Sequence, residues 1–231
     1  MADTHILLTG GSRGIGAAIA ERIGGMDNVR LVTASSASGD LSNPSVPGQL
    51  WQDALEKLDG RIDVLINNAG VFEANSIGLG EIEWLENWHY TMDVNLTAAA
   101  LLCREAVLHF RSRNGGRIVN MASRAAYRGD SPQHWHYAAS KAGMVAMTKT
   151  IARGYARDNI LAFAICPGFT MTGMADDYPE SRGGDRLLQE IPLGRVAMPD
   201  EIAEIAAFCA LHAPPSMTGA VIDANGASYV R

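Results

Sequence analysis

The sequence has few cysteines, no long apolar run and no block of like charges. Its three cysteines, Cys103, Cys166 and Cys209, lie far apart and show no C-x-x-C spacing. Such a sparse, odd set is typical of reduced core thiols in a cytosolic protein rather than of a disulfide framework. No stretch approaches the roughly 18 apolar residues of a membrane-spanning helix, and the first residues do not resemble a signal peptide. We therefore expect a cytoplasmic protein with no membrane partner.

The net charge and the length of the chain indicate which partners and how many domains to expect. Asp and Glu (25) outnumber Lys and Arg (19), which gives a formal net charge of -6. This balance argues against binding to a phosphate backbone, so we expect no nucleic acid partner. The 231 residues, of which 47% are hydrophobic, can bury one sizeable core. We find no linker, repeat or low-complexity tract and predict one domain over residues 1–231.

Short apolar runs alternate with segments of helical period along the chain. Continuous apolar runs of this length are typical of strands buried on both faces, as in a parallel sheet. The runs are Ile6 to Leu8, Val29 to Thr33, Val64 to Ile66, Arg117 to Met121, Leu161 to Cys166 and Ala220 to Ile222. The helical patterns are 17–23, 95–110, 137–156 and 200–211. This repetition predicts a doubly wound α/β fold with a mostly parallel central sheet.

A glycine-rich loop directly follows the first predicted strand. It reads Thr9-Gly10-Gly11-Ser12-Arg13-Gly14-Ile15-Gly16 and opens the first predicted helix. Glycines let backbone N–H groups approach a pyrophosphate closely, and a helix N-terminus adds partial positive charge. The spacing is G-x-x-x-G-x-G, whereas the commoner dinucleotide pattern is G-x-G-x-x-G. By itself the loop is equally compatible with a plain strand-to-helix turn.

Together with later motifs, this loop resembles the cofactor loop of the short-chain dehydrogenase/reductase family. The other motifs follow in the family's order: Asn67-Asn68-Ala69-Gly70, Asn95, Ser123, Tyr137-x-x-x-Lys141 and Pro167-Gly168-Phe169-Thr170-Met171-Thr172. The resemblance spans nearly the whole chain, up to Asn225-Gly226. Within the family it looks closest to the 3-oxoacyl-acyl-carrier-protein reductases, on the residues Pro192 to Arg195, Asp200 to Ala203 and Thr218-Gly219.

Several structural expectations come from this resemblance. It implies a single Rossmann-like domain, a homotetramer or homodimer, and a mobile loop at about 171–190 that closes over the substrate. It also implies a bound dinucleotide that contacts five segments of the chain. The residues concerned are Gly10, Ser12, Arg13, Gly14, Ile15, Gly16, Ser35, Ser36, Asp40, Leu41, Asn67, Ala69, Gly70, Tyr137, Lys141, Pro167, Gly168, Thr170 and Thr172.

Tyr137 and Lys141 are the predicted proton-transfer pair. Because they lie four positions apart at the start of a helical segment, their side chains share one face. A phenol has a reference pKa near 10, and a nearby ammonium favours the phenolate. We therefore expect Lys141 to tune Tyr137 toward the working pH. The pattern Y-x-x-x-K also occurs by chance in exposed helices, and it is the accompanying motifs that favour the functional interpretation.

The resemblance also gives roles to Ser123 and Asn95. It implies that Ser123 hydrogen-bonds the substrate carbonyl oxygen and that Asn95 holds a water that relays protons to the lysine. Ser123 follows a predicted strand at the edge where α/β sheets bind ligands, although a serine there also serves as a turn cap. Asn95 is a poor helix former inside an apolar helix, which indicates a polar contact. One residue more than the family's usual spacing separates Ser123 from Tyr137, and we place it in the loop 129–136.

The predicted cofactor is NADP rather than NAD. In this family a carboxylate at the end of the second strand binds the ribose 2′-OH and marks NAD. Here that strand ends at Ala34-Ser35-Ser36 without a carboxylate, and Arg13 offers a cation to a 2′-phosphate. The chain then reaches Gly39 and Asp40 almost at once, so the helix that the family usually inserts there is expected to be missing. Asp40 resembles the family residue that contacts adenine.

Two further signals have plainer interpretations. His134 and His136 lack the additional ligands of a metal site, so we expect no metal and place both at the substrate mouth. Arg124 and Arg128 are expected to be solvated surface residues. The alternative is that they meet an anionic substrate tail or a carrier protein.

The predicted function is hydride transfer between a nicotinamide and a carbonyl or secondary alcohol. A 3-oxoacyl thioester, free or carrier-bound, is one candidate substrate. Two alternatives stay open: a sensor that binds NADP without turnover, and a NAD-dependent dehydrogenase of small alcohols or sugars. The complete set of Asn95, Ser123, Tyr137 and Lys141 favours an enzyme, because a sensor has no need of a tuned tyrosine.

Overall fold

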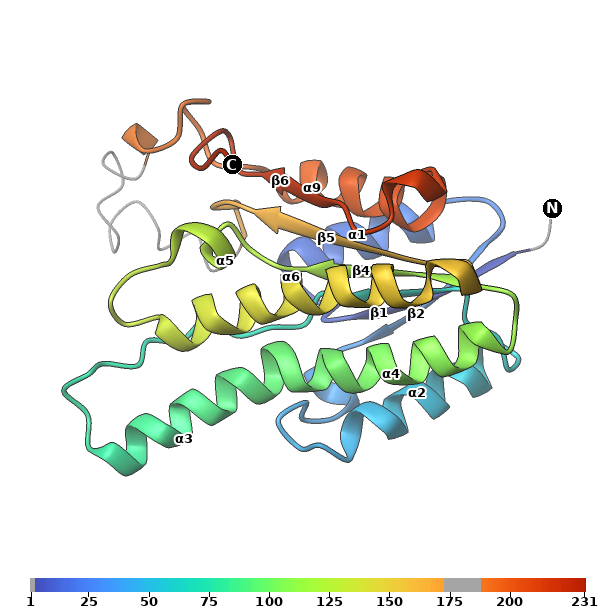
Figure 1. Cartoon of the computed structure of the whole chain (residues 1–231), viewed down its shortest axis with the longest axis horizontal. Coiled ribbons are helices and arrows are strands. Elements are labelled where there is room, and N and C mark those ends of the chain that lie inside the picture. Colours follow the sequence, from blue (N-terminus) through green and yellow to red (C-terminus); the bar gives the residue numbers. More distant parts are fainter. Residues whose placement is uncertain (1–2, 173–187) are drawn as a thin grey trace.

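The described part of the chain, residues 3–172 and 188–231 of a computed structural model, is built on one six-stranded sheet (Figure 1). The strand order is β2-β1-β3-β4-β5-β6, and every neighbouring pair is parallel. The strands are β1 (Thr4–Thr9), β2 (Val29–Ala34), β3 (Val64–Asn67), β4 (Gly116–Met121), β5 (Ile160–Pro167) and β6 (Val221–Ala224). They coincide with the six predicted apolar runs, so the predicted fold class is confirmed.

Helices cover both faces of this sheet. In Figure 1, α1 (Gly14–Gly24) and α9 (Pro199–Ala207) lie behind it, and α2 (Val46–Lys57), α4 (Ala98–Arg111) and α6 (Trp135–Tyr155) lie in front. The other described helices are α3 (Glu81–Met92) and the short α5 (Ala125–Arg128). The described chain also has 3-10 turns at Ser36–Ser38, Ala156–Asp158 and Pro215–Met217, and π-helical segments at Asp93–Thr97 and Phe208–His212. No helix among the described residues has the length and apolar character needed to cross a membrane.

The two covered faces explain why the strand residues are continuously apolar. Ile6 and Leu8 of β1 belong to the core cluster that contains Ile19 of α1, whereas Leu7 between them belongs to the cluster that contains Trp51 of α2. Ile6, Leu7 and Leu8 are all fully buried. Because successive strand side chains point to opposite faces, a strand covered on both sides needs an apolar residue at every position.

The helix predicted from residue 95 was placed too short. In the structure it begins at Glu81 and runs through α3 and the π-helical segment Asp93–Thr97 into α4 (Figure 1). The missing part, α3, is only partly covered: Trp84, Trp88 and Met92 are half-buried, and Thr91 is its one buried residue. The helix α2 was also not predicted, since a proline and a glycine in its first turn obscure the pattern.

The segment after β2 agrees with the expectation of a missing helix. A 3-10 turn at Ser36–Ser38 is followed by turns until α2 begins at Val46. The strand β2 lies at the edge of the sheet, and the chain crosses from there to β3 on the other side of β1. The winding direction therefore changes between β1 and β3, and open α/β sheets bind ligands at the carboxyl ends of such strands.

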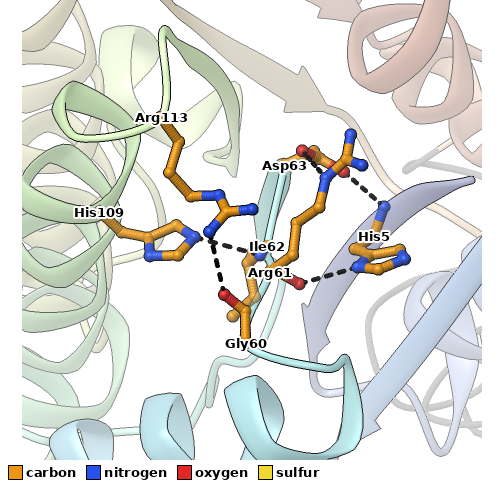
Figure 2. A network of polar contacts seen from close by, with 7 residues as sticks. All are labelled: His5, Gly60, Arg61, Ile62, Asp63, His109 and Arg113. Carbon is orange, nitrogen blue, oxygen red and sulfur yellow. Dashed lines mark hydrogen bonds and ion pairs between the residues drawn. The ribbon is translucent and has the colours of Figure 1, made fainter. Parts of the chain in front are cut away.

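A polar network fixes the opposite, amino-terminal edge of the same strands. Figure 2 shows the carboxylate of Asp63 accepting hydrogen bonds from the backbone N–H of His5 (2.9 Å) and from Nε of Arg61 (2.8 Å). In the same figure the backbone N–H of Ile62 donates to Nε2 of His109 on α4, at 3.2 Å. These contacts tie the start of β3 to β1 and α4, away from the edge that carries the predicted site.

Candidate active site

The glycine loop after β1 has the form of a phosphate cradle. Gly10 and Gly14 have positive φ angles of 69° and 55°, which favour glycine. A Cβ at Gly16 would lie 1.9 Å from the carbonyl oxygen of Gly10, so any side chain there would clash with the backbone. The helix α1 begins at Gly14, and the N–H groups of its first turn have no partners within the helix. Arg13 immediately precedes the helix and is exposed.

Asn68 locks this cradle to the loop that follows β3. Its Nδ2 donates to the carbonyl oxygens of Thr9 (3.2 Å) and Gly10 (3.0 Å). In return, Oγ1 of Thr9 accepts from the backbone N–H groups of Asn68 and Ala69, each at 3.1 Å. The sequence motif contained Asn68, but we did not select it as a site residue. Its role depends on two loops that meet only when β1 and β3 pair.

The predicted adenosine-side residues lie at the carboxyl end of β2. Ser36 is exposed and Ser35 half-buried, with the Ser35 hydroxyl accepting from the backbone N–H of Ala37 at 3.3 Å. The carboxylate of Asp40 accepts from the backbone N–H of Ser42 at 2.9 Å, and this bond lowers the pKa of Asp40 from its usual value. Leu41 packs against the core cluster of α2 and α4.

Asn67 occupies a different environment from the other predicted cofactor residues. Its side chain is 2% exposed, and Nδ2 donates to Oδ1 of Asn120 at 2.8 Å. Asn120 in turn donates to Oγ1 of Thr148 at 2.8 Å, which links β3, β4 and α6. No local pattern pointed to Asn120 or Thr148, because their hydrogen-bond partners come from distant segments. The geometry indicates that Asn67 orders the strands beneath the loop.

The turn after β5 closes the other side of the cradle. The backbone N–H of Gly168 donates to the carbonyl oxygen of Ala224 at 3.0 Å, and Thr170 forms a parallel bridge with Ala197. A Cβ at Gly14 would lie 3.1 Å from Cγ2 of Thr172. Thr172, far away in the sequence, therefore lies against the glycine loop.

Lys141 and Tyr137 lie on the first turns of α6, which begins at Trp135. Lys141 is 4% exposed, and its Nζ donates to the carbonyl oxygen of Met121 at 2.8 Å. Burial lowers the pKa of Lys141 from 10.5 to about 8. The Nζ atom lies 5.8 Å from the centre of the half-buried Tyr137 ring. The structure thus brings the ammonium and the phenol together, as the four-residue spacing predicted.

Asn95 lies in the π-helical segment and clamps the chain in front of Lys141. Its Oδ1 accepts from the N–H of Val71 (2.8 Å), and its Nδ2 donates to the carbonyl oxygen of the same residue (2.9 Å). A Cβ at Gly70 would lie 3.1 Å from Oδ1 of Asn95 and 3.5 Å from Nζ of Lys141. Such π-helical turns inside α-helices are frequent at functional sites. The side-chain amide of Asn95 is therefore used to position the backbone beside the lysine.

Ser123 follows β4 at the same edge, two residues after Met121. It is 8% exposed, and its Oγ accepts from the backbone N–H of Ala125 at 3.1 Å. This bond fits the turn-cap alternative and leaves the hydroxyl proton available for donation. The two roles are compatible, because a hydroxyl donates one hydrogen bond and accepts others.

Known proteins are similar to this chain over nearly its whole length. The family described as enoyl-(acyl carrier protein) reductase matches residues 28–226. An acetoacetyl-CoA reductase from Shinella zoogloeoides is 32% identical over 239 residues, which cover 96% of this chain and 97% of the relative. The chain belongs to the short-chain dehydrogenase/reductase family. This family member is an oxidoreductase that uses a nicotinamide cofactor.

Other relatives of this short-chain dehydrogenase/reductase carry related names. A 3-oxoacyl-[acyl-carrier-protein] reductase from Pseudomonas aeruginosa is 31% identical, with 97% of this chain and 96% of the relative covered. A protein of the same name from Synechocystis is 33% identical, with 95% and 94% covered. The family assignment made from the motifs is confirmed.

The expectation that Arg124 is a solvated surface residue was wrong. Arg124 is 7% exposed, and its guanidinium lies over the ring of Phe169 at 4.2 Å. The turn after β5, which carries Phe169, lies next to the loop after β4. A hydrogen bond from the backbone N–H of Arg124 to the carbonyl oxygen of Pro167 (3.0 Å) joins the two segments. Arg128 is exposed as expected and pairs with Glu190 at 3.3 Å.

His134 and His136 are also more buried than an open substrate mouth would require. His134 is 6% and His136 1% exposed, and burial lowers the pKa of His136 from 6.5. Neither ring nitrogen of His136 has a hydrogen-bond partner. Among the described residues, no group of three or more His, Cys, Asp or Glu side chains could hold a metal ion. Most of the predicted substrate loop, 171–190, lies outside the described residues.

The three cysteines are free and buried, as predicted. Burial raises the pKa of Cys103 to about 12 and those of Cys166 and Cys209 to about 11. Thiols held protonated in this way are poor nucleophiles.

Proposed function

We propose that this protein is a NADPH-dependent ketoreductase in which Tyr137 is the proton donor. The observation that carries the proposal is the pair of Tyr137 and Lys141 on one helix face, with the ammonium buried and anchored to the end of β4. A structural role alone would not call for a buried, costly ammonium beside a phenol. A sensor without turnover is for this reason the less favoured alternative.

The residues present fit a dinucleotide with a 2′-phosphate. The cradle of Gly10, Gly14 and Gly16 leaves no room for side chains, and the first turn of α1 offers free N–H groups to a pyrophosphate. At the end of β2 there is no carboxylate that would repel a phosphate, and the exposed Arg13 supplies a positive charge. These features support NADP over NAD as the cofactor.

The mechanism assigns a task to each of the site residues. A nicotinamide dinucleotide held by the glycine cradle and the first turn of α1 would supply or accept the hydride. The Ser123 hydroxyl donates a hydrogen bond to the substrate carbonyl oxygen and orients it toward Tyr137. The phenol gives its proton to that oxygen during reduction, and the Lys141 ammonium stabilises the phenolate that remains. Asn95 keeps the backbone at Val71 in place beside Lys141.

The substrate class is proposed from the relatives. Acetoacetyl-CoA reductase and 3-oxoacyl-[acyl-carrier-protein] reductase both carry names of 3-oxoacyl thioester reductases. We therefore propose a 3-oxoacyl thioester, or a ketone of similar shape, as the substrate. The family description also names enoyl reductases, so 2-enoyl thioesters belong in the same test.

The experiment is a turnover assay with wild-type protein and Tyr137→Phe. NADPH or NADH is mixed with ketones, 3-oxoacyl thioesters and 2-enoyl thioesters, and the loss of reduced cofactor is followed by absorbance; small alcohols and sugars are tested with NAD. We expect reduction with NADPH and a loss of about 10³-fold in kcat for Tyr137→Phe. Turnover that survives this substitution would refute the mechanism. Cofactor binding without turnover on any substrate would favour the sensor.

A further inference from the structure

We propose that Phe72 and His134 are positioning residues that hold the Tyr137 ring at a fixed distance from the Lys141 ammonium. This inference rests on the proposed function and names residues that the family motifs do not include. Three aromatic rings, those of His134, Phe72 and Tyr137, form a continuous series of contacts. His134 and Tyr137 lie at the start of α6, whereas Phe72 comes from the loop that follows β3. The Phe72 ring prevents the Tyr137 ring from moving toward it.

The contacts within this stack are close and well oriented. The Phe72 ring meets the Tyr137 ring edge-on, with centres 4.6 Å apart and planes at 83°. On its other side the Phe72 ring is stacked on His134, with centres 3.9 Å apart and planes within 3° of parallel. Edge-to-face and stacked pairs at these distances are favourable arrangements for aromatic rings. Phe72 is thus held between the imidazole and the phenol.

His134 and the backbone that carries Phe72 are both anchored by hydrogen bonds. Nδ1 of His134 is hydrogen-bonded to Oγ of Ser131 at 2.7 Å, and the backbone N–H of His134 donates to the carbonyl oxygen of Ser131 at 2.9 Å. The residue before Phe72 is Val71, whose N–H and carbonyl are both bonded to the Asn95 side chain. The stack therefore connects Asn95, through Val71 and Phe72, to the ring of Tyr137.

This connection matters because Lys141 cannot follow a displaced tyrosine. Its Nζ is fixed to the carbonyl oxygen of Met121 at the end of β4. The distance between the ammonium and the phenol is then set by where the Tyr137 ring lies, and the Phe72 ring packs against it. Proton transfer depends steeply on such placement, and a shift of about 1 Å can cost on the order of 10²-fold in rate.

The test compares Phe72→Leu and His134→Ala with the conservative variants Phe72→Tyr and His134→Phe. For Phe72→Leu we expect kcat to fall between about 10-fold and 10²-fold with little change in the KM for NADPH. The decline of the rate at alkaline pH should become shallower, because a displaced phenol depends less on the charge of Lys141. Phe72→Tyr and His134→Phe keep a ring in the stack and should recover most of kcat. Gln133→Ala, an exposed change in the same loop, is the matched control and should match wild type.

The outcomes separate this inference from the proposed function. If wild-type protein reduces no substrate, the proposed function fails. If wild type is active and Phe72→Leu retains its kcat and pH–rate profile, the positioning role is refuted. A loss of activity that tracks only a lower melting temperature, with an unchanged pH–rate profile in the folded fraction, would likewise refute it, since it would reveal a purely structural contact. NADPH binding, measured by cofactor fluorescence, should stay unchanged in all four variants.

Discussion

Lys141 donates from Nζ to the carbonyl oxygen of Met121 at 2.8 Å, in a position where 4% of its surface is exposed. The bond joins the helix that carries the tyrosine to the strand that leads to Ser123. It also holds a positive charge in a desolvated place, which lowers the pKa of Lys141 to about 8. The buried ammonium of Lys141 therefore lowers the stability of the folded protein, and the same charge serves the proposed chemistry.

Replacing Lys141 by methionine should stabilise the protein while abolishing turnover. The folded-state pKa of about 8 lies below the ordinary 10.5, so the unfolded chain binds the proton more tightly and stability rises with pH across that interval. At pH 7 the buried ammonium then costs the folded state on the order of 3 kcal/mol. We expect a higher melting temperature for Lys141→Met in calorimetry. The exposed control Lys57→Met should change neither the melting temperature nor turnover. A lower melting temperature for Lys141→Met would show that the buried ammonium does not destabilise the fold.

The rate of reduction should fall as the pH rises through about 8. Above that pH the pKa of Lys141 implies that its ammonium is lost, and with it the charge that stabilises the phenolate. Lys141→Arg keeps a charge that does not titrate in this range, so its residual activity should decline only at higher pH. Steady-state kcat/KM measured between mildly acidic and alkaline pH tests this. Identical profiles for the two proteins would exclude Lys141 as the titrating group.

Arg13 should determine the choice between the two dinucleotides. It is exposed next to the N-terminus of α1, and no carboxylate stands at the end of β2. We expect Arg13→Glu to weaken NADPH binding by about 10-fold to 10²-fold while NADH binding changes little, because the new carboxylate repels a 2′-phosphate and can bind a 2′-OH. Fluorescence titrations with both cofactors give the ratio. The control Lys149→Gln, on the second half of α6, should leave the ratio of NADPH to NADH affinity unchanged. If Arg13→Glu also leaves that ratio unchanged, Arg13 does not contact the cofactor.

Two glycine-to-alanine substitutions should have different effects, one on NADPH affinity and the other on stability. At Gly16 the new Cβ would meet the Gly10 carbonyl oxygen at 1.9 Å, so the cradle must deform and NADPH affinity should drop by at least about 10²-fold. At Gly48 in α2 nothing lies within 4 Å of the added atom. Alanine there should stabilise the protein by about 0.5–1 kcal/mol through helix propensity, measured by denaturant unfolding. Undiminished NADPH binding by Gly16→Ala would show that the loop is only a turn.

His109 should make the fold sensitive to acid. Its Nε2 accepts the Ile62 N–H, as Figure 2 shows, and its pKa is lowered from 6.5 first by burial and then by Arg113. A depressed folded-state pKa means that stability is present above about pH 6.5 and is lost as the pH falls below it, because the unfolded chain takes up the proton more readily. His109→Gln should lose less stability between pH 7 and pH 5 in thermal melts. His212→Gln, an exposed control, should follow wild type, and equal slopes for all three proteins would contradict this assignment.

The comparison of sequence and structure is clearest for the strands and for α6. The runs around Ile6 and Val64 could be identified because a strand covered by helices on both faces must be apolar at each position. Tyr137 and Lys141 could be paired because helical spacing is local and places residues four apart on one face. The helix α3 was not predicted, although Trp84, Trp88 and Met92 lie four residues apart on its half-buried face.

The sequence by itself determined the order of the motifs, the parallel sheet and the tyrosine–lysine pair, since each depends on spacing along a few neighbouring residues. The tertiary structure alone decided which distant segments meet. It buried Arg124 against Phe169, closed Asn95 onto Val71 and placed Phe72 between His134 and Tyr137. These contacts depend on which strands are neighbours and on how helices cross above them, and no local pattern in the sequence encodes that arrangement.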